Sequence, residues 1–161
     1  LLGLRRTNAF EKEIVGKNAA IKKMETQISI MKACQERFDS ILFDIKDILQ
    51  ADLFDDELDA ARELNKKGFS RGAGAVSGVV LEAHLATICG KHNIKTKKHP
   101  SINDYNQALK DNDILDTPTW RFIQHLADIR NTCDHKQKND PKRESVAELI
   151  EGVSKITKTL F

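Results

Sequence analysis

A short polar segment, Arg130-Asn131-Thr132-Cys133-Asp134-His135, holds the residue types best suited to chemistry in this sequence. Arginine offers planar, permanently charged donors that suit an oxyanion. Histidine exchanges protons near neutral pH. At 100° per residue the segment's polar members fall opposite an apolar stripe that faces the domain's own core, formed by Phe122, Leu126, Ile129 and Cys133. We therefore expect the polar members on an accessible outer face: Arg130, Asn131, Asp134 and His135.

The remaining histidines and the common catalytic motifs give weaker signals. The sequence has no phosphate loop ending in Gly-Lys-Ser/Thr, no His-Glu-x-x-His and no Gly-x-Ser-x-Gly. His92 and His99 lie in a predicted loop without nearby acidic or thiol partners, so we interpret them as solvated. His84 and His125 are single histidines on predicted helices, which are more often packed or half-exposed than catalytic. We expect no metal and no cofactor.

The composition indicates one helical domain. The chain has 161 residues, 31% of them charged and 40% hydrophobic, and its 3 prolines and 8 glycines favour long helices over a turn-rich sheet. A formal net charge of +2 is too small to indicate a nucleic-acid binder by itself. Three widely spaced cysteines, no apolar run near the roughly 20 residues of a membrane span and no signal peptide predict a cytoplasmic protein. The start at Leu1 leaves room for an additional upstream domain.

Residues 8–52 carry apolar side chains at alternating steps of three and four, which predicts a long helix. The members of this stripe are Ile14, Ile21, Met24, Ile28, Met31, Phe38, Leu42, Ile45 and Leu49. Asn8 and Glu11 have the spacing of a capping box and are expected to start the helix. Two interpretations stay open: packing on its own domain, which we favour, or an intermolecular coiled coil. We assign residues 1–52 to this segment and 53–161 to a helical bundle.

Five further helices are expected along the rest of the chain, at about 55–67, 71–89, 101–110, 118–135 and from 142 to the end. Gly68 is placed to end the first in a left-handed turn, Ser70 to cap the second, and Thr117 to cap the fourth. The small residues of 72–78, including Gly74 and Gly78, predict closely packed backbones at the centre of the bundle. The predicted fold is an all-α, up-and-down bundle without strands.

The last two helices differ in their apolar patterns. The last one has a single stripe that is expected in the core: Val146, Leu149, Ile150, Val153, Ile156 and Leu160. The helix before it has a second apolar arc on the side of the polar segment, formed by Trp120, Ile123 and Ala127. Such an arc needs another burial surface, either a helix of the same fold or a second subunit. We expect a homodimer with this arc at its interface.

The polar segment resembles the R-x(4-6)-H motif of HEPN domains, in which the residue after the arginine is typically polar and often asparagine, as in Arg130-Asn131-x-x-x-His135. A helical hairpin common in that superfamily is similar to the stretch from Ala60-Ala61-Arg62-Glu63-Leu64 through Gly68 to Val80-Leu81-Glu82-Ala83-His84-Leu85. The resemblance covers about residues 53–161.

The resemblance implies a metal-independent endoribonuclease in which two copies of the motif meet across a homodimer. Arg130 would stabilise charge on the nonbridging phosphate oxygens, and His135 would move protons at the 2′-hydroxyl or the leaving 5′-oxygen. Asn131 would orient the ring of His135 or the substrate, and Asp134 would hold the guanidinium in place. By analogy with the superfamily, the chain would be a toxin or antiphage effector, with an antitoxin as a further partner.

Basic residues near the motif and in the 91–100 loop are expected to contact RNA phosphates: Lys136, Lys138, Lys142, Arg143, Lys95, Lys97 and Lys98. Without the resemblance, the motif is a solvated helix end with an exposed Arg130–Asp134 ion pair. Two other functions stay open. One is a noncatalytic module that binds RNA or protein, and the other is an interaction scaffold built on the heptad segment.

Overall fold

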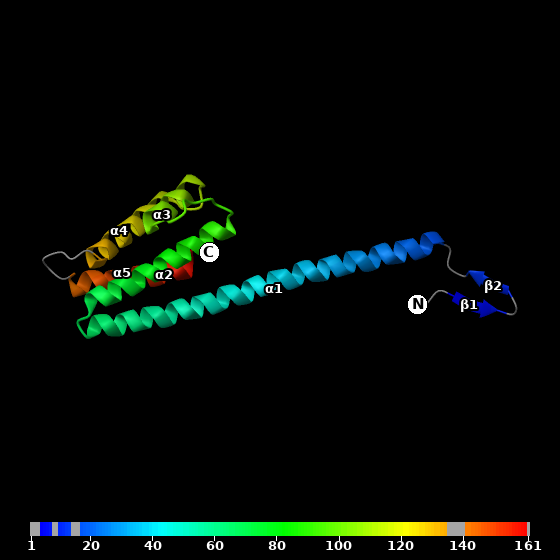
Figure 1. Ribbon diagram of the computed structural model, residues 1–161, viewed down its shortest axis with the longest axis horizontal. Helices are drawn as coiled ribbons and strands as arrows, with labels where there is room; N and C mark the ends of the chain where they lie inside the picture. Colours follow the sequence, from blue (N-terminus) through cyan, green and yellow to red (C-terminus); the bar gives the residue numbers. More distant parts are fainter. Residues whose placement is uncertain (1–3, 8–9, 14–16, 135–140, 161) are drawn as a thin grey trace. The chain divides into compact units, whose positions relative to one another are not determined.

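The computed structural model describes residues 4–7, 10–13, 17–134 and 141–160 (Figure 1). It divides into two compact units, Leu1–Ile48 and Leu49–Phe161. The second unit contains the helices that carry the candidate motif, and it is an all-α bundle as the sequence predicts.

The first unit begins with an antiparallel pair of short strands, β1 (Leu4–Thr7) and β2 (Phe10–Glu13). Leu4 pairs with Glu13 and Thr7 with Phe10. The prediction of no strand is therefore wrong, and so is the predicted helix start, because Glu11 lies in β2. Asn8 itself lies outside the described residues. A capping box is recognised by local spacing alone, and backbone pairing with the preceding residues takes precedence over it here.

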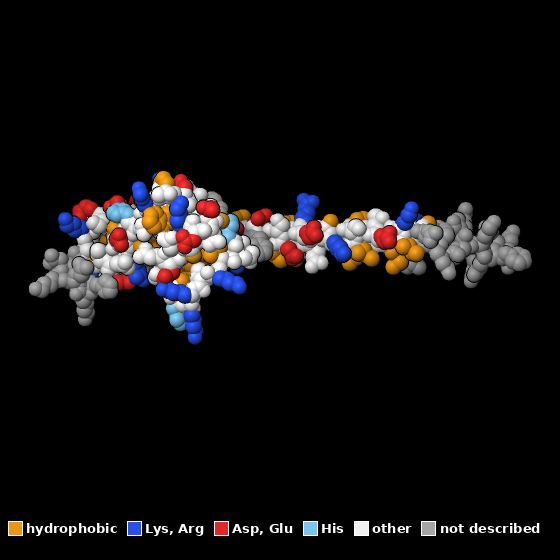
Figure 2. Space-filling model, turned by 90° about the horizontal axis from the view of Figure 1, so that it is seen from above, with side chains coloured by type: hydrophobic (Ala, Val, Ile, Leu, Met, Phe, Trp, Pro, Cys, Tyr) orange, Lys and Arg blue, Asp and Glu red, His pale blue; other side chains and the backbone are white. Residues whose placement is uncertain are grey.

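A single helix, α1 (Lys17–Lys66, 50 residues), replaces the two helices expected in this region. It contains neither glycine nor proline, so nothing in its sequence interrupts the backbone ladder. Within the first unit the seven stripe residues from Ile21 to Ile45 keep between 48% and 71% of their surface exposed. Figure 2 shows hydrophobic side chains at the surface along this helix. The stripe is therefore not buried within the described chain.

Gly68 ends α1 in the predicted left-handed conformation, with φ of 89°. Phe69 N donates to Leu64 O (2.9 Å) and Gly68 N donates to Asn65 O (3.1 Å), the pair of bonds that closes a Schellman turn. Ser70 is not the expected cap, because its hydroxyl donates to Asn65 Oδ1 (2.8 Å). Asn65 Nδ2 in turn donates to the carbonyl of Arg143 (3.0 Å), so the turn is tied to the start of the last helix.

The bundle is built around α2 (Ser70–Lys91), which packs against α3 (Ile102–Asp111), α4 (Thr117–Asp134) and α5 (Arg143–Thr159). In Figure 1, α2 and α5 lie between the α3–α4 pair and the carboxyl-terminal part of α1. By length and composition alone α2 could cross a membrane, but more than half of it is buried among the other helices, as in the central helix of a bundle. Its largest fully buried side chains include Val80, Leu81, Leu85 and Ile88.

The amino-terminal ends of α3 and α4 test an expected helix start and an expected cap. Ser101 and Asp104 form a capping box at the start of α3, which confirms the helix expected from there. At α4 the cap is Asp116 and not Thr117, because Asp116 Oδ1 accepts a hydrogen bond from Thr119 N (2.8 Å). The pKa of Asp116 is lowered mainly by its hydrogen bonds with Thr119. The stripe of α5 is buried as predicted, with Leu160 only partly so.

Candidate functional site

The last turn of α4 holds the arginine and the acidic residue of the candidate motif together. Arg130 Nη1 lies 2.5 Å from Asp134 Oδ2, with 28% and 36% of the two side chains exposed. This is the i,i+4 pair expected from the sequence. Asp134 is therefore placed to fix the orientation of the guanidinium.

Arg130 does not project freely from an outer face, as the sequence suggested. Its aliphatic stem lies on α2 at Gly78, where a Cβ added to the glycine would stand 2.5 Å from Arg130 Cγ and 2.9 Å from Nε. Among the described residues, Arg130 Nε is a buried atom without a hydrogen-bond partner. One edge of the guanidinium is thus pressed against the α2 backbone, while the Nη1 end reaches the surface beside Asp134.

Gly74, one turn earlier on α2, makes the matching contact with Cys133. A Cβ added to this glycine would stand 2.8 Å from Cys133 Cβ and still closer to its Sγ. The predicted close packing of the small-residue stretch is therefore confirmed, and its partner is the motif turn of α4. Burial raises the pKa of the Cys133 thiol, which makes this cysteine a packing residue and a poor nucleophile.

A second guanidinium lies at the same end of the bundle and was missed by the sequence analysis. Arg71 Nη1 donates to the backbone carbonyl of Cys133 (3.2 Å). A cation is favoured there because the last carbonyls of a helix carry partial negative charge. Its position could have been found from the antiparallel α2–α4 pairing, which brings the start of α2 to the end of α4, but that pairing is not visible in the sequence.

The other motif residues are only partly described. Asn131 is half-buried on α4, next to Arg130. His135, Lys136 and Lys138 lie outside the described residues. His135 directly follows Asp134, the last residue of α4, so the chain places it next to the Arg130–Asp134 pair in sequence.

The structure does not bring all the expected basic residues to the motif. Lys95, Lys97 and Lys98 are exposed in the loop after α2. Gly78 and Lys91 are thirteen residues apart on α2, so this loop begins about 20 Å from the contact between Gly78 and Arg130. Lys97 also pairs with Asp104 (2.7 Å), whose pKa is strongly lowered, first by the hydrogen bond from Lys97 and then by those from Ser101.

The two basic residues at the start of α5 behave differently from each other. Lys142 is exposed directly before α5. Arg143 is exposed, but its Nη2 donates to the carbonyl of Lys66 at the end of α1. It lines a shallow pocket between α1 and α5 whose charged rim is partly neutralised, because Arg62 pairs with Glu151 (2.9 Å). Arg143 thus closes the last turn of α1, and its phosphate contact stays a prediction.

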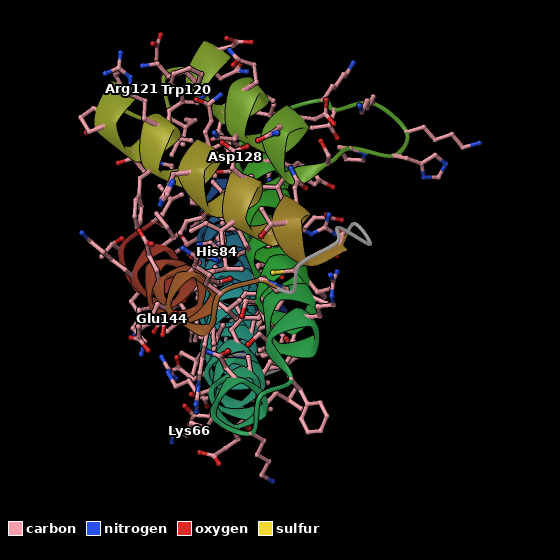
Figure 3. The ribbon with its side chains drawn as sticks, turned by 90° about the vertical axis from the view of Figure 1, so that its left-hand side faces the viewer. Lys66, His84, Trp120, Arg121, Asp128 and Glu144 are labelled. Atoms are coloured by element: carbon pink, nitrogen blue, oxygen red, sulfur yellow. The ribbon has the colours of Figure 1, made fainter. Side chains whose placement is uncertain are left out.

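The predicted interface arc on α4 is wrong. Ile123 and Ala127 are buried at 0% and 2% exposure inside the bundle, and Trp120 is half-buried. The reason is that α3 covers this side of α4, where Asn106 Nδ2 donates to the carbonyl of Trp120 (2.9 Å). In Figure 3, Trp120 lies at the start of α4, on the side of α2 that is opposite to Lys66. The second burial surface is therefore another helix of the fold.

The remaining histidines do not form a second site. His84 is buried in the bundle (Figure 3). Its Nε2 donates to the carbonyl of Leu160 (3.0 Å), and its ring meets Phe54 edge-on. Burial lowers the pKa of His84, and the positive charge of Lys91 acts in the same direction against the hydrogen bond to Leu160. His125 pairs with Glu148 at the surface (2.9 Å). Within the described residues there is no cluster of metal ligands.

Comparisons with protein families, curated proteins and solved structures found no match to this chain. The site is therefore interpreted from its own geometry and from the motif.

Proposed function

We propose that this chain is a metal-independent endoribonuclease of the HEPN type, active as a homodimer whose two motifs form one composite site. The observation that carries the proposal is the arginine at the end of α4. Its stem is seated on Gly78, its Nη1 is held by Asp134, and His135 follows directly. A solvated surface arginine needs no glycine beneath it, whereas an arginine that must meet a phosphate at a fixed angle benefits from one.

The chemistry is a transfer within the RNA backbone. One His135 removes the proton of the 2′-hydroxyl, whose oxygen forms a bond to phosphorus. The phosphorus–5′-oxygen bond breaks, and the His135 of the second copy protonates the leaving oxygen. Arg130 stabilises the charge on the nonbridging oxygens, and Arg71 adds positive potential at the same end of α4. The products carry a 2′,3′-cyclic phosphate and a 5′-hydroxyl.

A new interface is needed for the composite site, since α3 covers the arc first expected to form it. The open face of α2 supports a replacement, because it carries small and apolar side chains that flank the seat of Arg130. Val79 is 60% exposed, Ala75 is exposed and Ala86 is half-exposed. Ala75 lies one turn before Val79 and Ala86 two turns after it, so the three residues share one helix face. Packing this face against its copy would place the two Arg130 residues on either side of one groove.

The test is cleavage of mixed cellular RNA in EDTA. Since the stem of Arg130 packs on Gly78, Arg130→Met keeps that packing and removes only the charge, whereas Arg130→Ala removes both. We expect Arg130→Met and His135→Ala each to reduce cleavage by about 10²- to 10⁴-fold. Arg121→Met, an exposed arginine of the same helix, and His92→Ala are the matched controls and should cleave normally.

Expression of the wild type and of the two control variants should be toxic to growth, and expression of Arg130→Met or His135→Ala should not. This result would support the toxin or antiphage role, with an antitoxin as the natural partner. A purified wild type that binds RNA and leaves it uncut, with the motif variants unchanged, would exclude the enzyme and favour the noncatalytic binding module.

The scaffold function has an observation of its own. The exposed apolar stripe of α1 has the pattern of a protein-binding surface. This argument does not depend on the function of the bundle.

A further inference from the structure

The amino-terminal part of α1 presents a coiled-coil seam without a partner in the described residues of the chain. In heptad notation, the a positions are Ile21, Ile28, Gln35 and Leu42, and the d positions are Met24, Met31, Phe38 and Ile45. The apolar members keep 48% to 71% of their surface exposed. A contiguous exposed apolar strip marks an interaction surface, and the heptad spacing of this one suits packing against another helix.

We propose that residues 25–46 of α1 pair with the same segment of a second copy of this chain, in an antiparallel two-stranded coiled coil. This contact uses residues other than those of the proposed ribonuclease site, and it goes beyond that function. The identity of the partner helix and the antiparallel orientation of the pair both follow from the charges beside the seam.

The e positions alternate in sign along the helix: Glu25, Lys32, Asp39 and Lys46. In an antiparallel pair, e positions face e positions of the partner. Aligning Glu25 with Lys46 of the partner also aligns Lys32 with Asp39 of the partner, so all four contacts of the symmetric dimer join opposite charges. A shift by one heptad in one direction places Lys32 opposite itself, and a shift in the other places Asp39 opposite itself. The sign pattern therefore selects one register.

The same register gives a consistent core. It stacks Ile28 on Ile45 of the partner and Met31 on Leu42 of the partner. Gln35 then meets Phe38 of the partner at the centre, where a single polar a position helps to define the register. Six layers result from the two-fold symmetry.

A parallel pair lacks this charge complementarity. There, each e position faces a g position, and the g positions are uncharged: Ala20, Gln27, Cys34, Ile41 and Ile48. The charged e residues would gain no ionic partner in that arrangement, so the antiparallel direction is favoured.

The first experiment measures the molar mass of the full chain by light scattering at tens of micromolar. Ile28→Glu places a charge in the seam and should halve the molar mass of the wild-type assembly. Ile30→Glu is the matched control, because Ile30 is 57% exposed at an outward c position two residues away, and it should leave the mass unchanged. A monomeric wild type, or equal masses for all three proteins, would overturn the proposal.

The second experiment tests direction and register by a charge exchange. Lys32→Glu and Asp39→Lys each place like charges in contact in the antiparallel homodimer, and each should weaken association by about tenfold or more. Mixing the two variants should restore it, because in the mixed dimer the new glutamate faces the new lysine and Asp39 faces Lys32. In addition, Ile41→Cys should form a disulfide with Cys34 of the partner under mild oxidation, since g faces g in this register, while the outward Ser40→Cys should not. Absence of both the rescue by mixing and the 34–41 disulfide would refute the antiparallel pairing.

Discussion

Two helices of this protein, α1 and α5, carry the same kind of apolar repeat but differ in how much of it is exposed. The stripe of α5, from Val146 to Ile156, is between 0% and 3% exposed, whereas the stripe of α1 from Ile21 to Ile45 stays between 48% and 71% exposed. Both stripes have steps of three and four residues. The repeat therefore tells which face of a helix must be covered, and it does not tell whether the cover comes from the same chain.

The difference between the two segments lies in what flanks them. The helix α5 packs against α2 and α4 of its own bundle. Beside the stripe of α1, the e positions alternate in charge along the helix. Such charges do not contribute to packing in an apolar core, but they can pair with opposite charges on a partner helix. Charge patterning beside a stripe is thus the better indicator of an intermolecular seam than the stripe itself.

The largest effect should come from replacing a leucine by alanine in each of the two stripes and comparing the results. Leu149→Ala leaves a cavity in the core, where Leu149 is 0% exposed, and should lower the free energy of unfolding by about 2–5 kcal/mol. Leu42→Ala, at a position 49% exposed, should leave the unfolding of the bundle unchanged and weaken only self-association. Chemical denaturation and light scattering of both variants measure these outcomes. Equal loss of bundle stability in both would contradict the comparison.

A smaller effect is expected at the contact between α2 and α4. Gly74→Ala places a Cβ 2.8 Å from Cys133 Cβ and should cost about 1–3 kcal/mol of stability through overpacking. Gly90→Ala is the matched control, since no atom of the described residues lies within 4 Å of its added Cβ. Alanine is the better helix former, so this variant should gain about 0.5–1 kcal/mol of stability. Thermal melts of the two variants should shift in opposite directions. A stable Gly74→Ala would mean that α4 is not seated on α2 at this point.

Much of the fold followed from local signals in the sequence. The Schellman turn at Gly68, the start of α3 at Ser101 and the buried stripe of α5 depend on residues within one or two helical turns, so they were predictable. The strand pair at residues 4–13 and the cover of Ile123 by a neighbouring helix depend on contacts between separate segments. A single sequence carries little information about such contacts.

The candidate site shows the same division. The Arg130–Asp134 pair is an i,i+4 contact on one helix and was expected. The seat of Arg130 on Gly78 and the hydrogen bond from Arg71 join α4 to α2, and only the three-dimensional packing reveals them. Glycines in the middle of a helix signalled that some neighbour comes close, without telling which one.

At the start of α4, two variants compare the cap that the structure shows with the cap that local sequence rules favour. Asp116→Ala removes the acceptor for Thr119 N and should lower the melting temperature by a few degrees. Thr117→Ala, at the position that local sequence rules favour as the cap, should have the smaller effect because its hydroxyl contacts only Lys110 Nζ (3.1 Å) among the described residues. Thermal denaturation at pH 7 compares the two. A larger loss for Thr117→Ala would restore the cap expected from the sequence.

The smallest effect should be a pH dependence that is confined to the bundle. The only histidines of this chain lie at positions 84 and beyond, so α1 has no group whose ordinary pKa lies between about 5.5 and 7.5. Burial lowers the pKa of His84 in the folded state, so the unfolded chain takes up the proton first as the pH falls. The stability that neutral His84 contributes is therefore complete above its unfolded pKa and is lost as the pH falls through that value towards the folded pKa. Urea midpoints should decline over this range in the wild type and in the exposed control His92→Gln, and the decline should be shallower in His84→Gln. Self-association through α1 should stay constant over the same range, since α1 contains no histidine. An equal slope in all three proteins would show that His84 is not the titrating group, and a parallel loss of self-association would show that the seam and the bundle are not independent.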